Sequence, residues 1–143
     1  MAIRDIRVNQ LIEDKDTRVS VGLALPLGRQ PGGDGYFTTT KTTMDSIKTD
    51  IRTLLMTQRG ERLMQPGLGM NIRRFLFEQI TENTVIEIEN DIVSTFSRWL
   101  PFVQLNDIEV DLKDQDMNKI KINIQFNIVN TPSELQSVGV VLG

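Results

Sequence analysis

The side chains in this sequence that could do chemistry are carboxylates. It contains nineteen acidic residues but no histidine and no cysteine. Histidine-dependent serine and cysteine hydrolases, disulfides and cysteine-type zinc sites are therefore excluded. Paired carboxylates catalyse glycoside hydrolysis, and the sequence supplies candidates: Glu61, Glu78, Glu82, Glu87 and Glu89. We expect these glutamates to be solvated charges on helix surfaces, because no sequence feature places one carboxyl in the apolar pocket that a general acid requires.

Two further patterns could bind ions. Asp114-x-Asp116-x-Asn118 resembles the start of a calcium loop, but Lys119 replaces the required glycine and Gln125 replaces the bidentate glutamate. A polar hairpin turn is the favoured interpretation, and we predict no metal ligands.

Gly67-x-Gly69 precedes a predicted helix that carries Arg73 and Arg74, so its backbone could hold an anion. Two glycines after a proline more often indicate a tight turn with a close backbone approach. The arginine pair is typical of a solvated helix face, although an acidic protein partner could also use it. We therefore predict no cofactor site.

Composition predicts one globular domain over residues 1–143 that binds proteins. Hydrophobic residues make up 39% and charged residues 24%, with a net charge of −3, so neither nucleic acid nor membrane is an expected partner. No stretch approaches membrane-spanning length, and the N-terminus lacks the apolar run of a signal peptide. We expect synthesis and assembly in a cytoplasm.

Three segments make up the expected domain. Residues 18–41 combine a strand at 18–25, with Val19, Val21 and Leu23 alternating, and a Gly/Pro loop. Residues 43–102 form the helical part. Residues 103–143 form a β-hairpin and a final strand.

The helical part contains three predicted helices. The first is capped by Thr43 and runs to about Thr57, the second covers residues 71–79, and the third covers 83–100, with Thr84 and Glu87 as a capping box. Residues 61–65 between the first two are expected to be extended. Pro101 ends the third helix.

Alternating isoleucines predict a hairpin whose strands lie near residues 108–112 and 119–128. The register that keeps both faces consistent places Asp111 opposite Lys121. A turn at Thr131 and Pro132 leads to a last, nearly uncharged strand at 136–142. The predicted fold is α+β, an antiparallel sheet with a C-terminal hairpin packed against about three helices.

One long motif is more specific than these patterns. Residues 57–69 read Thr-Gln-Arg-Gly-Glu-Arg-Leu-Met-Gln-Pro-Gly-Leu-Gly, and Phe-Leu-Phe-Glu follows at 75–78. It resembles the baseplate wedge and sheath-initiator family of contractile-tailed phages, labelled lysozyme-like, which also has members in type VI secretion baseplates. The resemblance covers about residues 43–126, and its motif positions are Gly60, Glu61, Arg62, Pro66, Gly69 and Phe77.

The resemblance implies a non-enzymatic protein of the virion tail baseplate, present in multiple copies. Its implied partners are other wedge proteins and the tail sheath protein. Where the family commonly has Glu-Pro-Arg, this chain has Leu100-Pro101-Phe102, so both charges are lost. We predict that Trp99, Leu100, Pro101 and Phe102 dock on the wedge core, with Trp99 as a plain core residue the alternative.

The last strand is the predicted site of tail sheath assembly. Its residues Val138, Val140, Val141 and Leu142 would pair with an extended arm of a sheath subunit and so template the first sheath ring. The alternative is a strand paired wholly within its own domain. A peptidoglycan-degrading lysozyme-like enzyme and a free-standing cytosolic adaptor remain as alternative functions.

Overall fold

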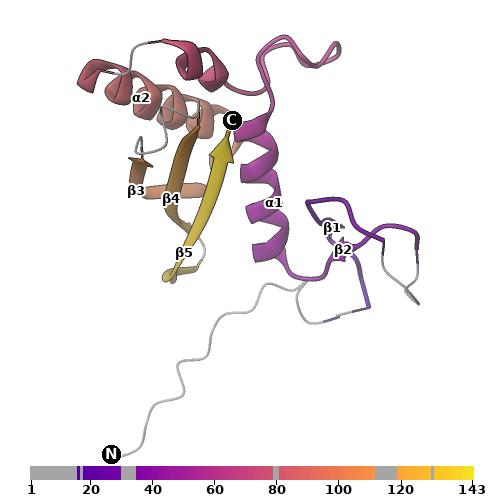
Figure 1. Ribbon diagram of the computed structural model, residues 1–143. Helices are drawn as coiled ribbons and strands as arrows, with labels where there is room; N and C mark the ends of the chain where they lie inside the picture. The colour runs from indigo at the N-terminus through magenta and orange to yellow at the C-terminus, as the bar shows by residue number, and fades with distance from the viewer. Residues whose placement is uncertain (1–15, 17, 30–34, 79–80, 112–118, 130) are drawn as a thin grey trace, which may run out of the picture. The chain divides into compact units, whose positions relative to one another are not determined.

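The computed structural model describes residues 16, 18–29, 35–78, 81–111, 119–129 and 131–143. The elements follow one another in the order β1 (Gly22–Leu23), β2 (Thr39–Thr40), α1 (Thr43–Met56), the 3-10 helix η2 (Ile72–Phe77), α2 (Glu82–Trp99), β3 (Val103–Asp111), β4 (Ile120–Ile128) and β5 (Thr131–Leu142) (Figure 1). This confirms the predicted α+β class. The chain divides into two compact units, residues 1–50 and 51–143. The single-domain organisation stays a prediction.

The predicted N-terminal strand is wrong in length. In the first unit β1 pairs with β2 over two residues only, Gly22 with Thr40 and Leu23 with Thr39. The side chains of Val19, Val21 and Leu23 remain exposed. Their alternation therefore does not mark a buried sheet face, which is the physical basis of a long strand signal.

Helix α1 has nearly the predicted bounds but a different cap. The Thr42 hydroxyl accepts a hydrogen bond from the Asp45 backbone N–H at 3.2 Å and donates one to the Asp45 carboxylate at 2.7 Å. Thr43, the predicted cap, is instead the first helical residue. The predicted apolar stripe is confirmed, since four of its residues are buried: Ile47, Ile51, Leu54 and Leu55.

Helix α2 begins one turn earlier than its predicted capping box. Thr81 is the N-cap, and it forms a reciprocal box with Thr84, whose hydroxyl accepts a hydrogen bond from the Thr81 N–H at 3.2 Å. Glu87 is not the box partner and lies 3.5 Å from Arg74. No helix in the described ranges is long and apolar enough to cross a membrane.

The C-terminal sheet is antiparallel and has the strand order β3-β4-β5. Asp111 pairs with Lys121, which confirms the predicted hairpin register. A register shift between Leu105 and Asp107 interrupts β3, whereas β5 already begins at Thr131, where a turn was predicted. The hairpin turn with the calcium-like pattern lies outside the described residues.

The core of the second unit lies between this sheet and the helices around it. Helix α2 contacts β3, and Figure 1 shows α2 crossing the strands of the sheet. The buried side chains come from every element of this unit: Ile51, Leu54, Leu55, Ile72, Phe75, Ile88, Ile92, Phe96, Val103, Ile120, Ile122, Ile124, Phe126, Val138, Val140 and Leu142. Burying each large side chain stabilises the fold by roughly 1.5 to 3 kcal/mol.

Candidate functional site

The motif singled out in the sequence forms one hydrogen-bonded loop. We call residues 57–70 the motif loop; it leads from α1 to η2 and consists of turns. The extended segment predicted at 61–65 is therefore wrong. The reason is local, because backbone hydrogen bonds run from Glu61 to Gln58 at 3.1 Å and from Gln65 to Arg62 at 3.2 Å within the loop.

Gly69 closes the base of the motif loop. The Met70 N–H donates to the Thr57 carbonyl at 2.9 Å, which holds the two ends of the loop together. Gly69 has φ of +101°, and a Cβ added there would lie 2.2 Å from the Thr57 carbonyl oxygen. Only glycine fits this approach, so Gly69 serves the close backbone contact that the sequence favoured.

The upper half of the loop is closed in the same way. The Gly60 N–H donates to the Pro66 carbonyl at 2.8 Å, and Gly60 has φ of +87°. The Glu61 carboxylate accepts from the Gln58 N–H at 2.9 Å. Gly60, Glu61 and Pro66 thus have a role inside the loop itself, as Gly69 has at its base.

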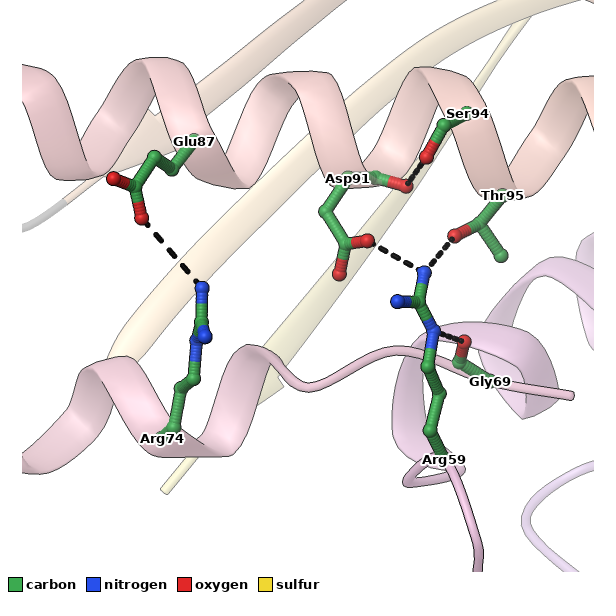
Figure 2. A network of polar contacts seen from close by, with 7 residues as sticks. All are labelled: Arg59, Gly69, Arg74, Glu87, Asp91, Ser94 and Thr95. Carbon is green, nitrogen blue, oxygen red and sulfur yellow. Dashed lines mark hydrogen bonds and ion pairs between the residues drawn. The ribbon is translucent and has the colours of Figure 1, made fainter. Parts of the chain in front are cut away.

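Arg59 fastens the motif loop to α2 (Figure 2). Its Nη2 donates to the Asp91 carboxylate at 2.6 Å and to the Thr95 hydroxyl at 3.3 Å, and its Nε donates to the Gly69 carbonyl at 3.2 Å. Hydrogen bonds of this kind, with a charged partner, are the stronger ones in proteins. The sequence reasoning missed Asp91 and Thr95, although their i, i+4 spacing places both on one face of a helix.

The tip of the motif loop is apolar and points into solvent. Leu63 is 95% exposed and Met64 is 93% exposed, and they are the two central residues of the turn closed between Arg62 and Gln65. Phe77, the last motif position, is 82% exposed at the end of η2. The motif therefore combines an anchored base with exposed apolar side chains.

A cleft of about 480 Å³ lies beside this loop, lined by Arg59, Asn71, Arg74, Glu87, Asn90, Asp91 and Ser94. Two of the lining residues are carboxylates, and each is paired with an arginine: Asp91 with Arg59 at 2.6 Å and Glu87 with Arg74 at 3.5 Å (Figure 2). Every lining side chain is polar. The cleft thus lacks the apolar enclosure with which glycosidases create a general acid.

Arg73 and Arg74 are both exposed, in line with the solvated helix face that we expected for this pair. Arg74 pairs with Glu87, and its guanidinium lies 4.4 Å from the centre of the Phe75 ring.

Partial burial raises the pKa of the Asp50 carboxyl, but Asp50 is exposed as a whole residue and does not line the cleft described above. In the ranges that the structure describes, no three acidic side chains are grouped to hold a metal ion.

The predicted docking residues at the end of α2 differ in their exposure to solvent. Leu100 is only 8% exposed and its N–H donates to the Phe96 carbonyl at 2.8 Å, so its side chain belongs to the core. Phe102 is 43% exposed and Pro101 is exposed. Trp99 is half-buried, with the Arg98 guanidinium 5.3 Å from its ring. The docking role stays a prediction, with Phe102 its most accessible large side chain.

The predicted sheath-pairing residues lie on β5, at one edge of the sheet. Val138, Val140 and Leu142 are buried and pair with Ile124, Ile122 and Ile120 of β4, respectively. Val141 is 57% exposed and lies opposite Lys121 on the open face. Among the described residues, β5 pairs with β4 only, so its other edge has no strand partner.

Comparison with known proteins reveals several similar chains. The baseplate wedge protein gp25 of Enterobacteria phage T4 is 22% identical over 131 residues, which cover 92% of this chain and 90% of that protein. A crystal structure described as a candidate tail lysozyme from Geobacter sulfurreducens is 24% identical, covers 74% of this chain and 96% of its own, and has a TM-score of 0.62. A chain of the anti-feeding prophage baseplate is 24% identical, with coverage of 83% and 81% and a TM-score of 0.54.

At these identities the solved structures establish the shared fold alone. The family assignment comes from the sequence itself, because the family model of baseplate wedge protein gp25 matches residues 41–133. This range contains the motif loop and most of the sheet, and it confirms the predicted resemblance. Since the match spans more than half of the 143 residues, the chain belongs to the baseplate wedge protein gp25 family and is a structural component of the tail baseplate.

Proposed function

We propose that this baseplate wedge protein templates the first ring of tail sheath by accepting an extended arm of a sheath subunit at the free edge of β5. The observation that carries the proposal is the contrast between the two edges of the sheet. Strand β5 is twelve residues long and has no charged residue from Leu135 to its end. Long uncharged edges recruit other strands, because their backbone N–H and C=O groups lack partners.

The opposite edge is guarded. Strand β3 is interrupted by the register shift at Leu105 and Asp107, and its open face carries three acidic residues, Asp107, Glu109 and Asp111. Bulges and charges are the means by which proteins block unwanted strand addition. We therefore expect an added strand to pair with the free edge of β5 and not with β3.

The proposal includes docking on the wedge core through the end of α2, where Phe102 and Pro101 are exposed. The partners would be other baseplate wedge proteins and the sheath protein, with several copies of this chain in each particle. We further propose that the protein is not an enzyme, because its cleft beside α2 is polar throughout and both of its carboxylates are paired.

Proline substitution tests the strand addition, since proline cannot donate to a ladder. Successive N–H groups of a strand point to opposite edges, so one of Val140 and Val141 donates toward β4 and the other outward. Of Val140→Pro and Val141→Pro, the variant that retains its melting temperature should enter baseplates but fail to nucleate sheath in electron micrographs. Normal sheath on that variant would refute the proposal.

The matched control lies on the guarded edge. Glu109→Pro and Val110→Pro form the same kind of pair in β3, and the member that folds should support normal sheath. Loss of sheath with the β3 variant as well would indicate a general defect in the sheet.

A further inference from the structure

The turn at the tip of the motif loop has an unusual composition. Central turn positions favour Gly, Pro, Asn, Asp and Ser, because these residues suit the backbone geometry or satisfy it by hydrogen bonds. Here Leu63 and Met64 occupy both positions, at 95% and 93% exposure. Local physical preference does not account for two apolar side chains at a solvent-exposed turn, and such departures are expected where a surface has a function.

The loop beneath this tip is held by several hydrogen bonds. Beneath the tip, the Gly60 N–H bonds the Pro66 carbonyl at 2.8 Å and the Glu61 carboxylate bonds the Gln58 N–H at 2.9 Å. Below these, Arg59 is fixed to α2 through Asp91 at 2.6 Å (Figure 2). A loop ordered in advance loses little conformational entropy on binding, so this arrangement favours recognition of a partner.

Charge at the tip indicates the kind of partner. The Glu61 carboxylate is engaged inside the loop, whereas the adjacent Arg62 guanidinium has no ion-pair partner in the described part of the chain. The tip therefore presents two apolar side chains beside one positive charge. A complementary surface would be an apolar pocket with carboxylates at its rim.

We propose that Leu63 and Met64 insert into an apolar, acid-rimmed pocket on another protein of the baseplate, and that Arg62 pairs with a carboxylate at its edge. Methionine suits such a contact because its flexible, polarisable side chain adapts to the pocket. A lipid surface is disfavoured, since two side chains bury little area and the chain has a net charge of −3. This contact is separate from the β5 edge and from Phe102, so it goes beyond the proposed function.

Cross-linking in the assembled particle tests the proposal. The full-length chain would carry a photo-crosslinking amino acid in place of Gln65, which leaves Leu63 and Met64 intact, and would be assembled with the complete set of baseplate and sheath proteins. We expect a cross-link to one baseplate protein other than this chain. A cross-link to the sheath protein, to a second copy of this chain, or to nothing overturns the proposal.

Substitutions at the tip provide a second test of the proposal. Leu63→Ser/Met64→Ser should reduce incorporation into baseplates by roughly 30-fold, as expected for loss of interface anchors. Because both side chains are more than 90% exposed, the melting temperature should not change. Ile86→Ser, at a 54% exposed position on α2, is the matched control and should be incorporated normally. Normal incorporation of the double variant overturns the proposal.

Substitutions of Arg62 test the charged part of the proposed contact. Arg62→Glu should weaken incorporation further than Arg62→Gln, because it places like charges at the pocket rim. Equal incorporation of both variants would contradict an acidic rim. The β5 proline variants are expected to enter baseplates and fail only in sheath nucleation, so the two proposals fail separately.

Discussion

Arg59 Nη2 lies 2.6 Å from the Asp91 carboxylate and joins the motif loop to helix α2 across thirty-two residues of sequence. The same guanidinium bonds the Gly69 carbonyl, so one side chain fixes both the helix contact and the base of the loop. The Arg59 side chain is 42% exposed, and solvent therefore weakens the ion pair itself. Its importance lies in the number of groups that it connects.

Arg59→Ala should destabilise the protein by about 1 to 2 kcal/mol, because three hydrogen bonds to two segments are lost together. Chemical denaturation of the wild type and the variant measures this loss. Arg74→Ala is the matched control, since its 3.5 Å pair with Glu87 is more exposed and should contribute within about 0.5 kcal/mol. Equal losses for the two variants would contradict the special role of Arg59.

Two glycines of the motif loop should differ sharply in their tolerance of alanine. Gly69→Ala should cost at least about 3 kcal/mol, because its φ of +101° is unfavourable for alanine and the new Cβ would meet the Thr57 carbonyl at 2.2 Å. Gly60→Ala has only the conformational penalty, about 1 kcal/mol, since a Cβ there meets nothing within 4 Å. Thermal unfolding of both variants checks the order, and a reversed order would refute this account of the loop.

Local patterns predicted the helices and the C-terminal hairpin, but not the length of the N-terminal strand or the start of β5. The register of Asp111 with Lys121 follows from side-chain alternation, because only one register keeps both faces of the hairpin consistent. The observed N-caps, Thr42 and Thr81, lie one and three residues before the predicted ones. Neighbouring threonines are equally good cap candidates in the sequence, and only the backbone conformation distinguishes them.

The candidate site was harder to predict, because it depends on distant contacts. Nothing in the sequence near Arg59 names Asp91 or Thr95 as partners, and the exposure of Leu63 and Met64 depends on how the loop is closed. Hydrophobicity alone indicates burial for such residues. The burial of Leu100 beside the exposed Phe102 likewise depends on which way the chain turns after α2.

Alanine substitutions at Leu100 and Phe102 should affect different properties, stability in the first case and docking in the second. Leu100→Ala should cost about 2 to 3 kcal/mol of stability, because the residue is only 8% exposed. Phe102→Ala should leave stability within about 1 kcal/mol, since its side chain is 43% exposed and its contact with Val129 is made by the backbone carbonyl. Incorporation into wedges should nevertheless fall for Phe102→Ala. Full incorporation of this variant would remove Phe102 from the docking surface.

Purified protein should not clear peptidoglycan suspensions at any pH from mildly acidic to neutral. In the cleft beside α2, Glu87 and Asp91 are each paired with an arginine and surrounded by polar side chains, so neither carboxyl has the apolar environment of a general acid. A turbidity assay with hen lysozyme as the positive control measures the activity. Glu87→Gln and Asp91→Asn serve as matched variants, and both should give the same flat trace as the wild type. Lysis by the wild type that either substitution abolishes would establish an enzymatic cleft and overturn the structural assignment of this surface.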